Sequence, residues 1–194
     1  GPHISSKDGP RGAHPREHIR PPSMEEFENW QEAAGGLVAM ITIAPELDGA
    51  IDYLREIAKR GVIVSLGHSD ASEEDIYKAT DAGARMSTHL GNGLSATLPR
   101  HPNVVWAQLA EDRLSASLIL DGHHLPSSTA QVMIRAKGTE RVVLVSDSVR
   151  FAGMKPGPYK SSIGGDVKVS SDGRVSISGT QFLAGSGVSL LDIV

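Results

Sequence analysis

The sequence contains no cysteine, and only 4% of its 194 residues are aromatic. Without cysteine the chain can form neither disulfide bonds nor thiolate metal sites, and this absence fits a reducing compartment. No apolar run reaches the roughly 18 residues that a membrane span requires, and no signal-peptide pattern is present. We therefore expect a cytoplasmic protein with no membrane partner.

Strong charge of one sign is also missing. The formal net charge is −4 and the isoelectric point is about 6.1, which argues against a nucleic-acid partner. The length is sufficient for one domain with a substantial core. The sequence starts without Met and stops inside what reads as a helix, so we expect an incomplete chain in which 1–194 forms part of one catalytic domain.

Short apolar runs alternate with helix-like segments over most of the chain. The expected strands are 37–43, 62–66, 85–88, 114–120 and 142–145. The expected helices begin after Ser23, an N-cap residue, and then cover 46–60, 72–83, 103–111 and 126–137. Five repeats of strand, polar strand end and helix are typical of a parallel α/β sheet, either a (β/α) barrel or an open sheet.

The pattern changes after Val149. Apolar and polar residues alternate in 166–169 and 174–177, on either side of a Ser-Asp-Gly turn, which predicts a β-hairpin excursion over about 159–180. The following Leu-Ala-Gly-Ser segment, 183–186, is expected to lead into a final helix. A Gly-Ser step at a helix start can bind a phosphate, although most such steps are plain N-caps.

Polar residues follow each expected strand: Glu46, His68, His89, His123-His124 and Asp147. Because the carboxyl ends of parallel strands meet at one rim, these side chains should converge there. Two neutral imidazoles, His68 and His89, suit a divalent transition metal. Asp147 could then transfer a proton from water to a leaving amine. The set favours hydrolysis of an amide or an ester.

Each of these residues also has a structural interpretation. A strand-end histidine is often only a hydrogen-bonded group, and Asp147 could be a helix N-cap. For Glu46 we favour the structural role, because a carboxylate at a helix start is stabilised by the helix dipole.

Six short motifs, in this order and with similar spacing, make the chain resemble the N-acetylglucosamine-6-phosphate deacetylase family of the amidohydrolase superfamily. They are Thr42-Ile43-Ala44-Pro45-Glu46, Gly67-His68-Ser69-Asp70-Ala71, Thr88-His89-Leu90-Gly91-Asn92, Asp121-Gly122-His123-His124, Leu144-Val145-Ser146-Asp147 and Leu183-Ala184-Gly185-Ser186. The resemblance covers nearly the whole chain. It implies an α/β fold that is part of a metal-dependent (β/α)₈ barrel, and deacetylation of N-acetylglucosamine 6-phosphate to glucosamine 6-phosphate and acetate.

The resemblance also implies roles for individual residues. His68 and His89 would bind one or two zinc or iron ions in the complete enzyme, Asp147 would be the catalytic acid and base, and Arg100 would reach the phosphate of a neighbouring subunit in a homodimer. The remaining substrate contacts would be Ala13 and His14 at the sugar, Asn92 and Gly93 at the phosphate, His124 at the acetyl carbonyl with Asp121, Gly122 and His123 in the same loop, and Leu183, Ala184 and Gly185 closing over the substrate.

The chain departs from the family pattern in several places. A metal-binding Glu that the family has directly before a Gly-Pro pair is absent, as are the first barrel strands and most of a small β-sandwich domain. Asn92-Gly93 replaces the usual Asn-Ala, and Ser148 replaces a usual Ala. We therefore expect the 194-residue chain alone to be nearly inactive. Two alternatives stay open: an amidohydrolase for a different N-acyl or cyclic amide, and a non-catalytic sugar-phosphate-binding protein.

Overall fold

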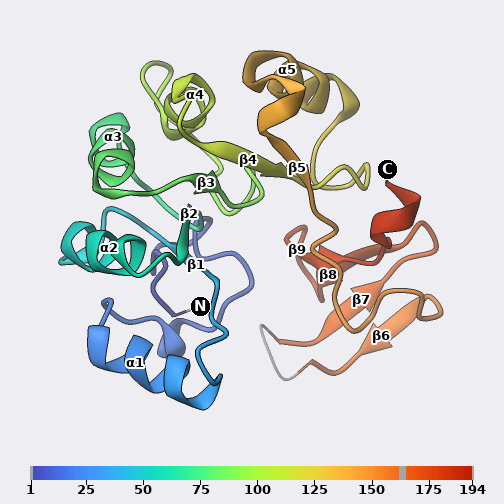
Figure 1. Cartoon of the computed structure of the whole chain (residues 1–194). Helices are drawn as coiled ribbons and strands as arrows, with labels where there is room; N and C mark the ends of the chain where they lie inside the picture. Colours follow the sequence, from blue (N-terminus) through green and yellow to red (C-terminus); the bar gives the residue numbers. More distant parts are fainter. Residues whose placement is uncertain (1, 162–164, 194) are drawn as a thin grey trace.

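The computed structural model describes residues 2–161 and 165–193 and contains two β-sheets (Figure 1). The first is parallel, has the strand order β1-β2-β3-β4-β5, and comprises Met40–Ile43, Ile63–Leu66, Met86–Ser87, Ser115–Leu118 and Val142–Leu144. The predicted α/β class and its parallel sheet are therefore confirmed. The described residues contain no helix long and apolar enough to cross a membrane.

Five helices connect and flank these strands, and in Figure 1 they form an arc outside the sheet. They are α1 Met24–Ala33, α2 Ala50–Lys59, α3 Glu73–Ala82, α4 Val104–Ala110 and α5 Ser127–Lys137. Short 3₁₀ turns occupy Arg16–His18, Thr139–Arg141 and Leu190–Asp192. The helix starts follow local capping chemistry: Ser72 forms a capping box with Asp75, and the Asn103 side chain accepts the first free N–H groups of α4.

Two apolar clusters hold the helices on the sheet. The larger lies under α1 to α3 and includes Phe27, Leu54 and Ile76, none of which is exposed. The smaller lies under α4 and α5 and includes Leu118 and Met133. Because both clusters cover the helix side of the strands, the strand ends and their loops are left to form the rim of a site.

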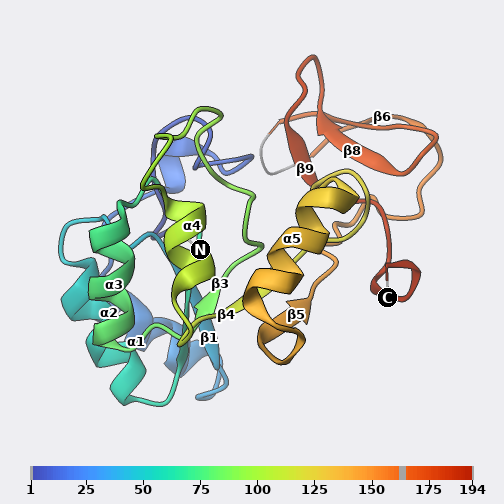
Figure 2. The same ribbon diagram turned by 90° about the horizontal axis from the view of Figure 1, so that it is seen from above.

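The second sheet is antiparallel and lies to one side of α5 (Figure 2). It comprises β6 Gly157–Tyr159, β7 Val167–Val169, β8 Arg174–Ile177 and β9 Leu183–Ser186, in that order. The predicted hairpin corresponds to β7 and β8, but two further strands flank it. The expected helix start at 183–186 is wrong, because this segment pairs with β8 as a strand and continues only into a 3₁₀ turn.

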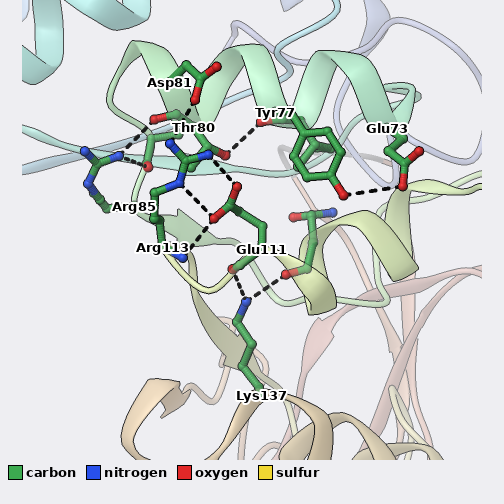
Figure 3. Close-up of polar contacts among 11 residues, drawn as sticks. Glu73, Tyr77, Thr80, Asp81, Arg85, Glu111, Arg113 and Lys137 are labelled. Carbon is green, nitrogen blue, oxygen red and sulfur yellow. Dashed lines mark hydrogen bonds and ion pairs between the residues drawn. The ribbon is translucent and has the colours of Figure 1, made fainter.

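A polar network ties together the helix ends on the side where the strands begin (Figure 3). The Lys137 side chain is only 1% exposed, and its ammonium donates to the backbone carbonyls of Gln108 and Glu111, at the carboxyl end of α4. The Glu111 carboxylate accepts two hydrogen bonds from the Arg113 guanidinium, which also bonds Asp81 on α3. Lys137 thus satisfies carbonyls that α4 leaves free at its end, and Arg113 links that end to α3 through the two carboxylates.

Both outer strands of the parallel sheet, β1 and β5, lack a second neighbour among the described residues. Apolar side chains near these edges are exposed: Met40 by 51%, its register partner Ile63 by 49%, and Val143 by 43%. Unpaired strands with exposed apolar side chains are surfaces on which another chain segment can pack.

Candidate functional site

His68, His89 and Asp147 share an unusual backbone conformation. Their φ angles are 53°, 30° and 50°, and within the described residues they are the only non-glycine positions with positive φ. Each lies just after a strand of the parallel sheet, β2, β3 or β5. Such conformations cost free energy. They concentrate at functional sites, where the direction of the side chain is required for function.

The two histidines point their outer ring nitrogens at each other. His68 Nε2 and His89 Nε2 are 3.0 Å apart, and the rings meet at 84° with centroids 4.7 Å apart. The His14 ring contacts the other side of His68, also at a centroid distance of 4.7 Å. Burial lowers the pKa of all three rings to about 4, so each is neutral at pH 7.

The surroundings of His68 fix which nitrogen faces inward. His68 Nδ1 lies 2.9 Å from the Pro10 carbonyl, which can only accept a hydrogen bond. The proton therefore sits on Nδ1, and Nε2 presents a lone pair, as metal-ligating histidines do. His89 Nδ1 is buried and has no hydrogen-bond partner within the described residues.

These observations fit a shared metal ion in part. Two nitrogens bound to one tetrahedral ion at about 2.0–2.1 Å are separated by about 3.3 Å, close to the distance between the two Nε2 atoms. However, the described residues contain no group of three His, Asp or Glu side chains that could hold an ion. His68 and His89 are thus a suitable pair of ligands but do not by themselves make a complete metal site.

Asp147 is the buried carboxyl group of the site. Burial raises its pKa, an effect that the nearby His124 and His14 rings oppose. A carboxyl with a raised pKa holds a proton more readily than one in water, as a group that alternates between base and acid requires.

His124 is held in place by Asp121. His124 Nδ1 is 2.8 Å from one Asp121 carboxylate oxygen, and the other oxygen accepts the backbone N–H groups of His123 and His124. Burial works against ionisation of Asp121, but these hydrogen bonds outweigh it and lower its pKa to about 2. With Nδ1 engaged by a carboxylate, Nε2 is the His124 atom available to a ligand.

A cavity of about 1280 Å³ gathers most of the predicted site residues. The predicted residues that line it are Ala13, His14, His68, His89, Asn92, Gly93, His123, His124, Asp147, Leu183, Ala184 and Gly185. Three others are not part of its lining: Asp121 lies behind His124, whereas Gly122 and Arg100 are exposed. Arg174 on β8, and Gln181 and Phe182 in the connection between β8 and β9, also line the wall, which sequence patterns did not indicate.

Small residues and hydroxyl groups allow this close packing. A Cβ on Gly93 would lie 2.9 Å from His68 Nδ1, and one on Gly67 would lie 2.6 Å from Thr88 Cβ. Thr88 Oγ1 in turn hydrogen-bonds Ser65 and Thr42 from the two preceding strands. Gly93, predicted as a phosphate contact, therefore also makes room for the His68 ring.

Glu46 lies outside the cavity lining and does not start a helix, because α2 begins only at Ala50. Its carboxylate accepts hydrogen bonds from the Ser69 hydroxyl, at 2.7 Å, and the Asp70 backbone N–H, at 2.6 Å. Glu46 thus orders the loop that follows His68.

No protein-family model matches the chain, but individual proteins do. It is 39% identical over 186 residues to N-acetylglucosamine-6-phosphate deacetylase of Bacillus subtilis, an alignment covering 96% of this chain and 46% of that protein. It is 40% identical over 149 residues to N-acetylgalactosamine-6-phosphate deacetylase of Shewanella, covering 77% of this chain and 37% of the relative.

Solved structures of deacetylases are similar to this chain as well. A mutant N-acetyl-D-glucosamine-6-phosphate deacetylase from Mycobacterium smegmatis, in complex with N-acetyl-D-glucosamine 6-phosphate, superposes with a TM-score of 0.89 at 32% identity, over 97% of this chain and 49% of that one. The deacetylase from Thermotoga maritima superposes with a TM-score of 0.86 at 33% identity, over 100% and 50% of the two chains. The chain spans about half the length of the relatives it matches.

Proposed function

Since the chain is a homologue of the N-acetylglucosamine-6-phosphate deacetylases, we propose that it supplies core residues for the metal-dependent hydrolysis of an N-acetylated amino-sugar 6-phosphate. The products are acetate and, from the glucosamine compound, glucosamine 6-phosphate. One observation supports this proposal above all: three strand-end residues, His68, His89 and Asp147, adopt left-handed backbone conformations around one cavity. Structural roles alone do not explain why all three residues adopt a backbone conformation that costs free energy.

In this proposal His68 and His89 hold a divalent ion, zinc or iron, through their Nε2 atoms. Such an ion polarises a carbonyl group and lowers the pKa of water. The family resemblance assigns a further carboxylate ligand that this sequence does not contain. We therefore expect the 194-residue chain, supplied with zinc, to release acetate at no more than a trace rate.

Asp147 moves the protons of the reaction. Its carboxylate accepts a proton from the attacking water, and the resulting acid donates that proton to the amide nitrogen as the C–N bond breaks. Because burial raises its pKa, the carboxyl retains the proton between these two events. Asp121 holds His124 Nδ1, so the Nε2 side of the ring is directed to the acetyl carbonyl in this proposal.

The rest of the cavity positions the substrate. We assign Ala13 and His14 to the sugar, Asn92 and Gly93 to the phosphate, and Leu183 to Gly185 to the cover over the sugar. Arg100 is exposed, so it is free to reach the phosphate in a second subunit of a homodimer. Its planar guanidinium can bind a phosphate through two hydrogen bonds.

A chimera tests the proposal with all ligands present. Residues 1–194 would replace the matching segment of the Bacillus subtilis relative, which supplies the remaining half. The chimera should release acetate from N-acetylglucosamine 6-phosphate, and Asp147→Asn should reduce kcat by about 10²- to 10⁴-fold. The same substitution at the exposed carboxylate Asp48 is the matched control and should have little effect.

The outcome separates the alternatives. A folded chimera without acetate release, which still binds the phosphorylated sugar, would favour a non-catalytic binding protein. Turnover of a panel comprising N-acetylglucosamine 6-phosphate, N-acetylgalactosamine 6-phosphate and unphosphorylated N-acetylglucosamine would show which substrate is preferred. Equal turnover with and without the phosphate would contradict the assignment of Asn92, Gly93 and Arg100.

A further inference from the structure

Ser186, the last residue of β9, lies against the backbone of Asp147. Its side chain is 1% exposed. The Ser186 N–H donates to the Asp147 carbonyl at 2.8 Å, and its carbonyl accepts the Val149 N–H at 3.0 Å. These two bonds form a parallel bridge between Ser186 and Ser148, so the antiparallel sheet is joined to the parallel sheet beside the acid of the site.

Gly185 permits this close approach. A Cβ at position 185 would lie 2.9 Å from the Asp147 carbonyl oxygen and 2.3 Å from Val149 Cγ1, and the residue has a φ of 81°. Both features exclude other residues without backbone movement. The Leu-Ala-Gly-Ser segment therefore fits closely against Asp147. This close contact explains why residue 185 is a glycine, and phosphate binding is not needed to explain it.

The Ser186 hydroxyl connects to a second member of the site. Its oxygen accepts the Val188 N–H at 3.1 Å, and the hydroxyl lies beside the Asp121 carboxylate, whose pKa it helps to lower. A carboxylate can only accept a hydrogen bond, so the hydroxyl is the donor of this pair. Asp121 is the residue that holds His124 Nδ1. One buried serine thus contacts both the backbone of Asp147 and the partner of His124.

We propose that Ser186 is a positioning residue that sets the relative placement of the Asp147 carboxyl and the His124 imidazole. The inference rests on the proposed function, in which those two groups act on opposite ends of the same amide. Backbone bonds from Ser186 hold Asp147 in its strained conformation, and the hydroxyl keeps Asp121 oriented so that His124 presents Nε2 to the cavity. Partners at this distance from the chemistry usually change rates about 10- to 100-fold when removed.

The first test uses the 194-residue chain itself and needs no substrate. Nuclear magnetic resonance of the ¹⁵N-labelled chain should show His124 as a single tautomer protonated on Nδ1. Ser186→Ala should give a mixture of tautomers, because Asp121 loses the hydroxyl that lies beside it, and Ser186→Thr should restore the single form. Ser189→Ala, an exposed serine three residues later, is the control and should leave the His124 signals unchanged.

Amide hydrogen exchange gives a measurement that needs no variant. The Ser186 and Val149 amides should exchange slowly, because both are bonded across the junction, whereas the Ser189 amide should exchange fast. Rapid exchange of Ser186 would overturn the inference even if the alanine variant failed to fold. An unchanged His124 tautomer in a folded Ser186→Ala chain would do the same.

The chimera described above separates this inference from the proposed function. In an active chimera Ser186→Ala should lower kcat about tenfold with little change in KM, and Ser186→Thr should recover most of the loss. Equal kcat for the alanine variant and the parent would contradict a positioning role. If the chimera releases no acetate but the tautomer still depends on Ser186, the proposed function fails and the structural link between Ser186 and His124 stands.

Discussion

At the scale of single residues, the site depends on where protons and lone pairs lie. His68 donates Nδ1–H to a loop carbonyl, and His124 engages Asp121 through the same nitrogen, so both present Nε2 to the cavity. His89 Nε2 faces His68 Nε2 at 3.0 Å. Two neutral rings so placed either share a proton between the nitrogens or share a cation.

The chain should therefore bind zinc weakly through these two rings. Titration with Zn²⁺ should shift the ring signals of His68 and His89 together in a nuclear magnetic resonance spectrum. Loss of an outer-shell partner already weakens metal binding about 10- to 100-fold, so His89→Ala should weaken it at least tenfold. His101→Ala, at an exposed histidine, is the control. Zinc shifts that persist in His89→Ala would place the ion elsewhere.

Sequence reasoning located these side chains because strand ends are easy to recognise. His68, His89 and Asp147 each follow a short apolar run, and parallel strands bring such residues to one rim. The Leu-Ala-Gly-Ser segment stood out as a motif, but neither the contact of Ser186 with the Asp147 backbone nor that of the Pro10 carbonyl with His68 could be predicted. Almost any residue type can supply a backbone N–H or carbonyl, so a contact made by the backbone leaves no pattern in the sequence.

At the scale of elements, helices were easier to predict than the second sheet. The period of buried residues and the Ser72 cap define α3 closely, whereas β6 contains Gly157 and Pro158 and has no alternating pattern. β9 is a strand only because β8 and the segment after Asp147 pair with it. Pairing between distant segments overrides local preference in such short strands.

The network around Glu111 should make the helix layer sensitive to acid. Hydrogen bonds from Arg113 lower the pKa of Glu111 to about 2, below its value of about 4.3 in an unfolded chain. Its stabilising contribution is therefore complete above that unfolded value and is lost as the pH falls toward 2. Glu111→Gln should lower the free energy of unfolding by about 1 to 2 kcal/mol at pH 7, and by much less near pH 2.

Urea unfolding followed by circular dichroism at the two pH values would measure this difference. Glu73→Gln on α3 is the matched control, since within the described residues the Glu73 carboxylate accepts only a long 3.4 Å hydrogen bond from Tyr77. A Glu111→Gln effect that does not depend on pH would show that the side chain stabilises the fold by packing rather than by charge.

At the scale of the whole molecule, two open edges of the parallel sheet dominate. β1 and β5 lack outer neighbours among the described residues, and Met40, Ile63 and Val143 expose large apolar areas there. In relatives about twice as long, additional chain is available to cover such surfaces. When the 194 residues are studied by themselves, these edges are available for pairing with another copy.

We expect the chain to self-associate in a concentration-dependent manner through these edges. Val143→Glu on β5 should reduce the associated fraction in sedimentation velocity experiments, because a charge on an edge strand opposes pairing. Met154→Glu, at a similarly exposed position in a loop outside the parallel sheet, is the control. An equal effect of both substitutions would indicate general repulsion instead of edge pairing.

The left-handed backbone at 68, 89 and 147 has a consequence for protein engineering. Glycine accepts such angles without penalty and would relieve about 1 kcal/mol or more at each position. A library screened only for heat resistance would therefore not select for the two imidazoles and the carboxyl group at these positions. Variants selected in this way could gain thermal stability while losing the side chains that the proposed hydrolysis requires.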